Sequence, residues 1–118
     1  MDYEYNRNRI VRAAIKGVLD TLPGGKAFLA YSDDVDEVFA GPTRDASKIV
    51  KELGTTDTEA VHFQNSDGDL VGWIYLVHDY GSNPGEIIAD YTTNLEEGLQ
   101  RSSEIADHIM DRWDAQDD

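Results

Sequence analysis

The fold of this chain is decided by residues 58–91, TEAVHFQNSDGDLVGWIYLVHDYGSNPGEIIADY. Apolar and polar side chains alternate over residues 59–64, which is the period of a strand with one buried face. The pair Asp67-Gly68 then predicts a hairpin turn, because glycine readily takes the positive φ angle that such turns require. Residues 70–77 hold few polar side chains, so they predict a central strand that is covered on both faces.

Gly72 interrupts this predicted central strand. A glycine inside a strand marks a bulge or a close approach of another backbone. After the strand, the run Gly81–Gly85 has the composition of a loop and leads to a further strand over residues 86–91. The whole stretch therefore predicts three strands in succession.

Upstream of this stretch, the sequence predicts a helix and a second hairpin. Asn6 or Asn8 is the expected N-cap of the helix, and apolar side chains then recur every three or four residues as far as Leu22. Residues 27–31 and 35–40 predict two short antiparallel strands.

The second and third helices are predicted from their capping residues. Thr43 is the expected N-cap of the second helix, and Asp45 lies in its first turn, where the helix dipole favours a carboxylate. The pattern Thr93-x-x-Glu96 is typical of a capping box and predicts the start of the last helix. The apolar and small residues of that helix step by four and three, as in a heptad seam: Leu95, Leu99, Ser102, Ala106, Ile109 and Trp113. This seam favours packing on the sheet, with a homodimer through the C-terminal helix as the alternative.

Together these elements predict an α+β fold in which residues 1–118 form a single domain. The expected order is α-β-β-α-β-β-β-α, with an antiparallel four- or five-stranded sheet and the first and last helices packed on it. The acidic tail, residues 114–118, is expected to fray. The order of strands within the sheet does not follow from the sequence.

Negative charge is the strongest feature of the composition. The chain has 10 Lys and Arg against 24 Asp and Glu, which gives a net charge of −14. Residues 1–26 carry a slight excess of basic side chains, whereas the rest of the chain is acidic. Such a surface repels nucleic acid and acidic membranes, and it attracts basic protein surfaces. The alternative is that the charge serves solubility alone.

The sequence contains no recognisable catalytic or metal-binding motif. Because it has no cysteine, disulfides and thiolate zinc sites are excluded. Its histidines, His62, His78 and His108, lie in three different predicted elements and lack the spacing of metal ligands. A Gly-x-Ser-x-Gly elbow and a complete phosphate-binding loop are also absent. We therefore expect a protein that is not an enzyme and that uses no cofactor.

The hydropathy pattern predicts a cytoplasmic protein. The N-terminal run is polar, so we expect no signal peptide. The apolar run Trp73–Val77 has the length of a strand, so we expect no membrane span.

Residues 68–94, GDLVGWIYLVHDYGSNPGEIIADYTTN, resemble small uncharacterised bacteriophage proteins. In these proteins an acidic turn leads into a strand with a Gly-Trp or Gly-Ala pair, and a loop then ends in Glu-x-Ile-Ala-Asp-(Tyr/His)-x-x-Asn. The matching residues in this chain are Gly72, Trp73, Glu86, Ile88, Ala89, Asp90, Tyr91 and Asn94. The resemblance implies a phage accessory protein that acts in the host cytoplasm, in host takeover or counter-defence. It implies no functional residues.

Charge and resemblance lead to the first functional expectation. The protein would bind and inhibit a host or defence-system protein with a basic surface, and would not itself bind nucleic acid or membranes. Its carboxylates would present a nucleic-acid-like negative surface to that partner. The residues expected to form this surface lie at or next to the tips of two predicted hairpins: Asp33, Asp34, Asp36, Glu37, Asp67 and Asp69.

Two alternative functions remain open at this point. The protein could bind or sequester a small ligand such as a signalling nucleotide, at the basic face of the first helix and the long loop. The residues of that site would be Arg7, Arg9, Arg12, Lys16, Tyr80, Asn83 and Tyr91. The second alternative is a structural or assembly protein that self-associates through its C-terminal helix. Trp73 and Tyr75 share a face of the predicted central strand and are a further binding candidate, with core packing as the alternative.

Overall fold

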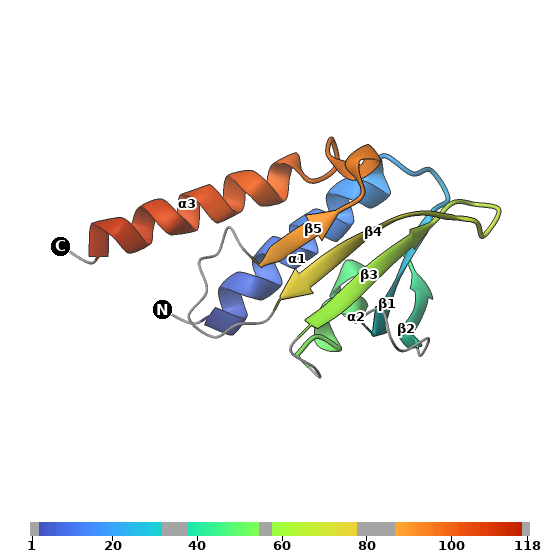
Figure 1. Cartoon of the computed structure of the whole chain (residues 1–118), viewed down its shortest axis with the longest axis horizontal. Helices are drawn as coiled ribbons and strands as arrows, with labels where there is room; N and C mark the ends of the chain where they lie inside the picture. Colours follow the sequence, from blue (N-terminus) through green and yellow to red (C-terminus); the bar gives the residue numbers. More distant parts are fainter. Residues whose placement is uncertain (1–2, 32–37, 55–57, 78–86, 117–118) are drawn as a thin grey trace.

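The computed structural model describes residues 3–31, 38–54, 58–77 and 87–116 (Figure 1). In these ranges the elements are α1 (Tyr3–Asp20), β1 (Lys26–Tyr31), β2 (Val38–Thr43), α2 (Ala46–Lys51), β3 (Thr58–Gln64), β4 (Leu70–Val77), β5 (Ile88–Tyr91), the 3-10 helix η2 (Thr93–Leu95) and α3 (Gln100–Gln116). The α+β class and the predicted order of helices and strands are confirmed. The strands form one antiparallel, five-stranded sheet in the order β2-β1-β3-β4-β5.

The hairpin between β3 and β4 closes on the side chain of Asn65. Its Oδ1 accepts hydrogen bonds from the backbone N–H groups of Asp67 at 2.9 Å and Asp69 at 3.0 Å. Gly68 takes a φ angle of +88°, which a side chain would strain. The predicted Asp-Gly turn is therefore confirmed, and it aligns Val61 opposite Ile74 in the middle of the two strands.

β4 departs from the sequence prediction, because its burial alternates along the strand. Ile74 and Leu76 are buried, whereas Trp73 and Tyr75 are half-buried. The buried side chains of the sheet join those of α1, α2 and α3 in one core. In Figure 1, α1 and α2 lie behind the sheet, and α3 runs along α1 and extends past the edge strand β5. The prediction of a strand covered on both faces was wrong, since large aromatic side chains also suit a half-exposed face.

Gly72 lies at an irregularity of the sheet, as the sequence predicted. Phe63 pairs with Gly72 but the next residue, Gln64, pairs with Leu70, so the register shifts at this point. A Cβ atom on Gly72 would lie 2.5 Å from the Oγ1 atom of Thr92 and 2.9 Å from the Cδ1 atom of Leu95. The close approach is therefore made by side chains that follow β5 and not by another backbone.

The second hairpin and the second helix are shifted relative to the prediction. β2 runs from Val38 to Thr43, so the expected strand over 35–40 ends too early, and residues 32–37 lie outside the described ranges. Because β2 is an edge strand, Pro42 can lie within it without breaking the sheet. The N-cap of α2 is Asp45 instead of Thr43, and its Oδ1 accepts the N–H of Ser47 at 3.0 Å.

Helix α1 starts at Tyr3, before the predicted caps Asn6 and Asn8. Its C-terminal end is held by Arg44, which precedes α2. The guanidinium of Arg44 donates hydrogen bonds to the carbonyl oxygens of Leu19, Leu22 and Gly25. These carbonyl groups lie at the end of α1 and in the turn that follows it. The last carbonyl groups of a helix have no N–H partner within the helix, so a side chain such as Arg44 can bind them.

Helix α3 packs along α1, and its seam faces the interior of the chain. Leu95, Leu99, Ser102 and Ala106 are all buried. The side chains of Ile109 and Trp113 lie outside the described part of the structure. The helix continues to Gln116, and the fraying predicted for residues 114–118 stays a prediction. None of the described helices is long and apolar enough to cross a membrane.

Candidate functional site

The predicted acidic surface is not brought together by the described residues. Asp67 and Asp69 are exposed in the turn between β3 and β4. Asp33, Asp34, Asp36 and Glu37 lie outside the described ranges. β1 reaches Tyr31 opposite Glu59, whereas the turn with Asp67 follows Gln64, at the other end of β3. The structure therefore describes only the Asp67 and Asp69 part of this predicted surface.

One residue of the predicted basic face of α1, Arg7, is not on the surface. Arg7 is only 3% exposed, so it belongs to the interior. Its guanidinium lies next to Gly54, with Nη1 3.3 Å from the position that a Cβ atom on Gly54 would take. The N–H of Gly54 in turn donates a hydrogen bond to Glu59 Oε1 at 2.8 Å. Arg7 precedes Ile10 and Ala14 by three and seven residues, which places it in the middle of the apolar stripe. That spacing was the signal in the sequence for its burial.

The remaining residues of the predicted small-ligand site are described only in part. Arg9 lies over the ring of Tyr5, with 5.8 Å between the guanidinium carbon and the ring centroid. Arg12 is half-buried and Lys16 is exposed. Tyr80 and Asn83 lie outside the described ranges. Tyr91 lines a pocket to which none of these α1 cations contributes.

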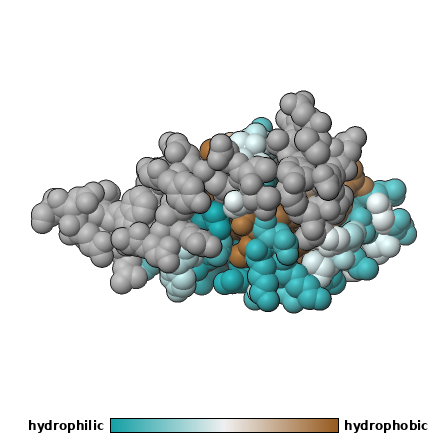
Figure 2. All heavy atoms as spheres, turned by 90° about the horizontal axis from the view of Figure 1, so that it is seen from below, coloured by the Kyte–Doolittle hydropathy of each residue, from teal (hydrophilic) through white to brown (hydrophobic). Residues whose placement is uncertain are grey.

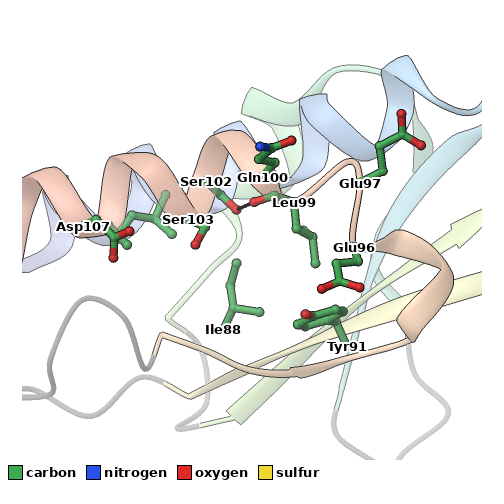
Figure 3. A pocket seen from close by; sticks show the side chains of 11 residues that line it. Ile88, Tyr91, Glu96, Glu97, Leu99, Gln100, Ser102, Ser103 and Asp107 are labelled. Carbon is green, nitrogen blue, oxygen red and sulfur yellow. Dashed lines mark hydrogen bonds between the residues drawn. The ribbon is translucent and has the colours of Figure 1, made fainter.

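This pocket lies between α3 and β5 and has a volume of about 580 Å³ (Figure 3). Helix α1 supplies one residue of its wall, and the segment from η2 to α3 supplies most of the others. The lining residues are Ile10, Ile88, Tyr91, Glu96, Glu97, Leu99, Gln100, Ser102, Ser103, Ala106 and Asp107. Volumes in this range are typical of sites that bind small molecules or short peptide segments.

The floor of the pocket is apolar. Ile10 comes from α1, Ile88 from β5, and Leu99 and Ala106 from the α3 region. Ile10, Leu99 and Ala106 are buried, and Ile88 is half-buried and packs against the same core. These residues meet because α3 lies along α1 on the helical side of the sheet, next to the edge strand β5.

The charged groups of the pocket are all acidic. Glu96, Glu97 and Asp107 are exposed, and no Lys, Arg or His contributes to the lining among the described residues. Figure 3 shows the carboxylate of Glu96 and the ring of Tyr91 at the same end of the cavity, with Asp107 at the other. The neighbouring Arg101 is paired with Glu104 at 3.6 Å on the exposed side of α3. The pocket therefore combines an apolar floor with carboxylates that face no cation among its described lining residues.

The pocket hydroxyls differ in what they can offer to a ligand. The Oγ atom of Ser102 is buried and donates to the carbonyl oxygen of Leu99 at 2.7 Å. Ser103, one residue further, is exposed at the same cavity. Among the described residues there is no group of three or more His, Asp or Glu side chains that could hold a metal ion. The chemistry available here is hydrogen bonding and charge pairing.

A second candidate surface is the face of the sheet that points away from the helices. Phe28, His62 and Trp73 lie side by side on β1, β3 and β4 and are half-buried. The rings of Phe28 and His62 stack with 5.5 Å between their centroids. Tyr75 shares this face of β4 with Trp73. The surface carries no charge pattern that would define what binds to it.

Comparison of the chain with protein-family models, with curated proteins and with solved structures found no match.

Sequence reasoning identified only Tyr91 among the pocket residues. Glu96 was interpreted as a capping residue, and Asp107 was not singled out. The pocket escapes a sequence-based search because it needs Ile10 and Ile88, which are far apart in the chain, to meet beside α3.

Proposed function

We propose that this protein is a non-enzymatic, acidic binding protein of the bacteriophage accessory type. It docks on a host or defence-system protein that has a basic surface and thereby inhibits it. The observation that carries the proposal is the pocket between α3 and β5, which has three carboxylates and no cation among its described lining residues. Such a site favours a cationic protein segment and disfavours nucleic acid.

The general surface supports the same function. The net charge of −14 gives a long-range attraction toward basic proteins. Figure 2 shows one side of the molecule, where the described surface is mostly hydrophilic and hydrophobic residues appear only in small areas. Asp67 and Asp69 add exposed carboxylates at the turn between β3 and β4. The carboxylates Asp33, Asp34, Asp36 and Glu37 stay predicted contributors to the docking surface.

The two alternative functions have less support. A nucleotide site on α1 would need Arg7 at the surface, whereas this side chain is buried. Self-association through α3 would need its seam, of which Leu99, Ser102 and Ala106 are buried within the chain.

The test is affinity capture from bacterial lysate, followed by rebinding of the identified partner in purified form at low and high salt. We expect binding that weakens as salt rises, because ions screen exposed charge pairs. The double reversal Glu96→Lys/Glu97→Lys should abolish it. The variant Asp67→Lys/Asp69→Lys makes the same change in net charge at the turn between β3 and β4, and it measures what this predicted part of the docking surface contributes. Binding by a neutral or acidic partner that is indifferent to salt and to both variants would refute the proposed function.

A further inference from the structure

We infer that the pocket between α3 and β5 receives an arginine side chain from a basic segment of the protein partner. This inference rests on the proposed function and specifies how the docking surface recognises its partner. It concerns the cavity itself and not the general negative field of the molecule.

The floor of the cavity suits the stem of a long basic side chain. An arginine buries three methylene groups on apolar surface while its charged end stays at a polar site. Ile88, Leu99 and Ala106 provide such an apolar surface on the two sides of the cavity. The volume of about 580 Å³ exceeds that of one side chain, so neighbouring residues of the partner segment also enter.

The polar end of the cavity suits a guanidinium group. Glu96 and Tyr91 stand at the same end of the pocket (Figure 3). A planar guanidinium can stack on an aromatic ring and donate two parallel hydrogen bonds to a carboxylate, whereas an ammonium group does neither equally well. Arginine is therefore favoured over lysine.

No Lys, Arg or His among the described residues lines the cavity. Within the described structure, Arg44 is bound to the end of α1, and Arg101 is paired with Glu104 on α3. Neither lines the cavity. The positive charge that complements these carboxylates is therefore proposed to come from the partner.

The test uses a synthetic peptide, acetyl-Ala-Arg-Ala-Arg-Ala-amide, titrated into the ¹⁵N-labelled protein at low salt. The control peptide carries citrulline, which has the shape of arginine without its charge. We expect the arginine peptide to shift the amide signals of Ile88, Tyr91 and Ser103, and the citrulline peptide to leave them unchanged. Equal shifts with both peptides would overturn the inference.

Two variants with equal net charge locate the binding. Glu96→Gln should weaken the affinity for the arginine peptide about fivefold, the scale of one partly exposed ion pair. Asp45→Asn removes the same charge before α2, beside the edge strand β2 at the opposite edge of the sheet from β5, and should leave the affinity within about twofold. If both variants weaken binding equally, the proposed function stands and the pocket assignment fails. If the wild-type protein binds neither this peptide nor any basic protein at low salt, both fail.

A gain-of-contact variant gives an independent check. Ser103→Arg places a guanidinium on an exposed position of α3 at the cavity. It should compete with the peptide and lower its affinity more than tenfold, whereas Ser66→Arg in the turn between β3 and β4 should not. If Ser103→Arg binds the peptide as the wild type does, the inference is overturned. A dimer that protects the pocket amides and excludes the peptide would overturn it in favour of a second copy of the chain.

Discussion

Gly17 of α1 and Gly98, which precedes α3, are in direct backbone contact. A Cβ atom on Gly98 would lie 2.9 Å from the carbonyl oxygen of Gly17 and 2.7 Å from the Cα atom of Val18. Because both positions lack a side chain, the segment that enters α3 can approach α1 closely. This contact sets the distance between the helices whose residues Ile10, Leu99 and Ala106 line the pocket.

We therefore predict that Gly98→Ala destabilises the protein by about 2 kcal/mol or more, because backbone atoms cannot move aside as a flexible side chain can. Urea denaturation followed by circular dichroism measures the change. Gly41→Ala is the matched control, since nothing lies within 4 Å of a Cβ atom there. It should change the free energy of unfolding by no more than about 0.5 kcal/mol. Equal effects at the two positions would contradict the close contact.

Arg44 is predicted to stabilise the end of α1. Arg44→Ala removes hydrogen bonds to the carbonyl oxygens of Leu19, Leu22 and Gly25. We expect a loss of about 1–2 kcal/mol in the free energy of unfolding, the scale of charged hydrogen bonds at a partly exposed site. The control Lys48→Ala removes the same charge from an exposed position of α2. A control that is as destabilising as Arg44→Ala would argue against this role.

Glu59 is predicted to stabilise the fold, although its side chain is ionisable. It is fully buried, and its Oε1 atom accepts the N–H of Gly54 at 2.8 Å. Glu59→Ala leaves this N–H without its acceptor and opens a cavity, so we expect a loss of about 3 kcal/mol. Glu59→Gln keeps an oxygen acceptor and should cost less. Thermal unfolding of both variants, with the exposed Glu97→Ala as control, measures the difference.

Asn65 is predicted to matter more than its exposed neighbours in the same turn. Asn65→Ala removes the acceptor for the N–H groups of Asp67 and Asp69. We expect a loss of about 1–2 kcal/mol, because each such bond contributes roughly 1 kcal/mol. Ser66→Ala at the exposed tip is the control and should be nearly neutral. Hydrogen exchange at the ends of β3 and β4 would show whether the loss is confined to this hairpin.

The hairpin and the helices illustrate what could be predicted and why. The pair Asp67-Gly68 predicted the turn correctly, because the backbone conformation of a hairpin turn depends on only a few neighbouring residues. The buried stripe of α1 followed from spacing alone, and the same spacing contained Arg7, whose charge led to the wrong assignment. The sequence prediction ended β2 at residue 40, before Pro42. A proline is acceptable within a strand only at the edge of a sheet, and local sequence does not show whether a strand lies at an edge.

The sequence by itself determined the type and order of the elements and the acidic character of the surface. Burial periodicity, caps and turns act between residues that are close in the chain. Only the tertiary structure decided that β5 lies at an edge beside α3, that Trp73 and Tyr75 face away from the helices, and that Glu96 stands at a cavity. These features depend on contacts such as those of Ile10, Ile88 and Leu99, whose meeting follows from strand order and helix packing and not from local propensity.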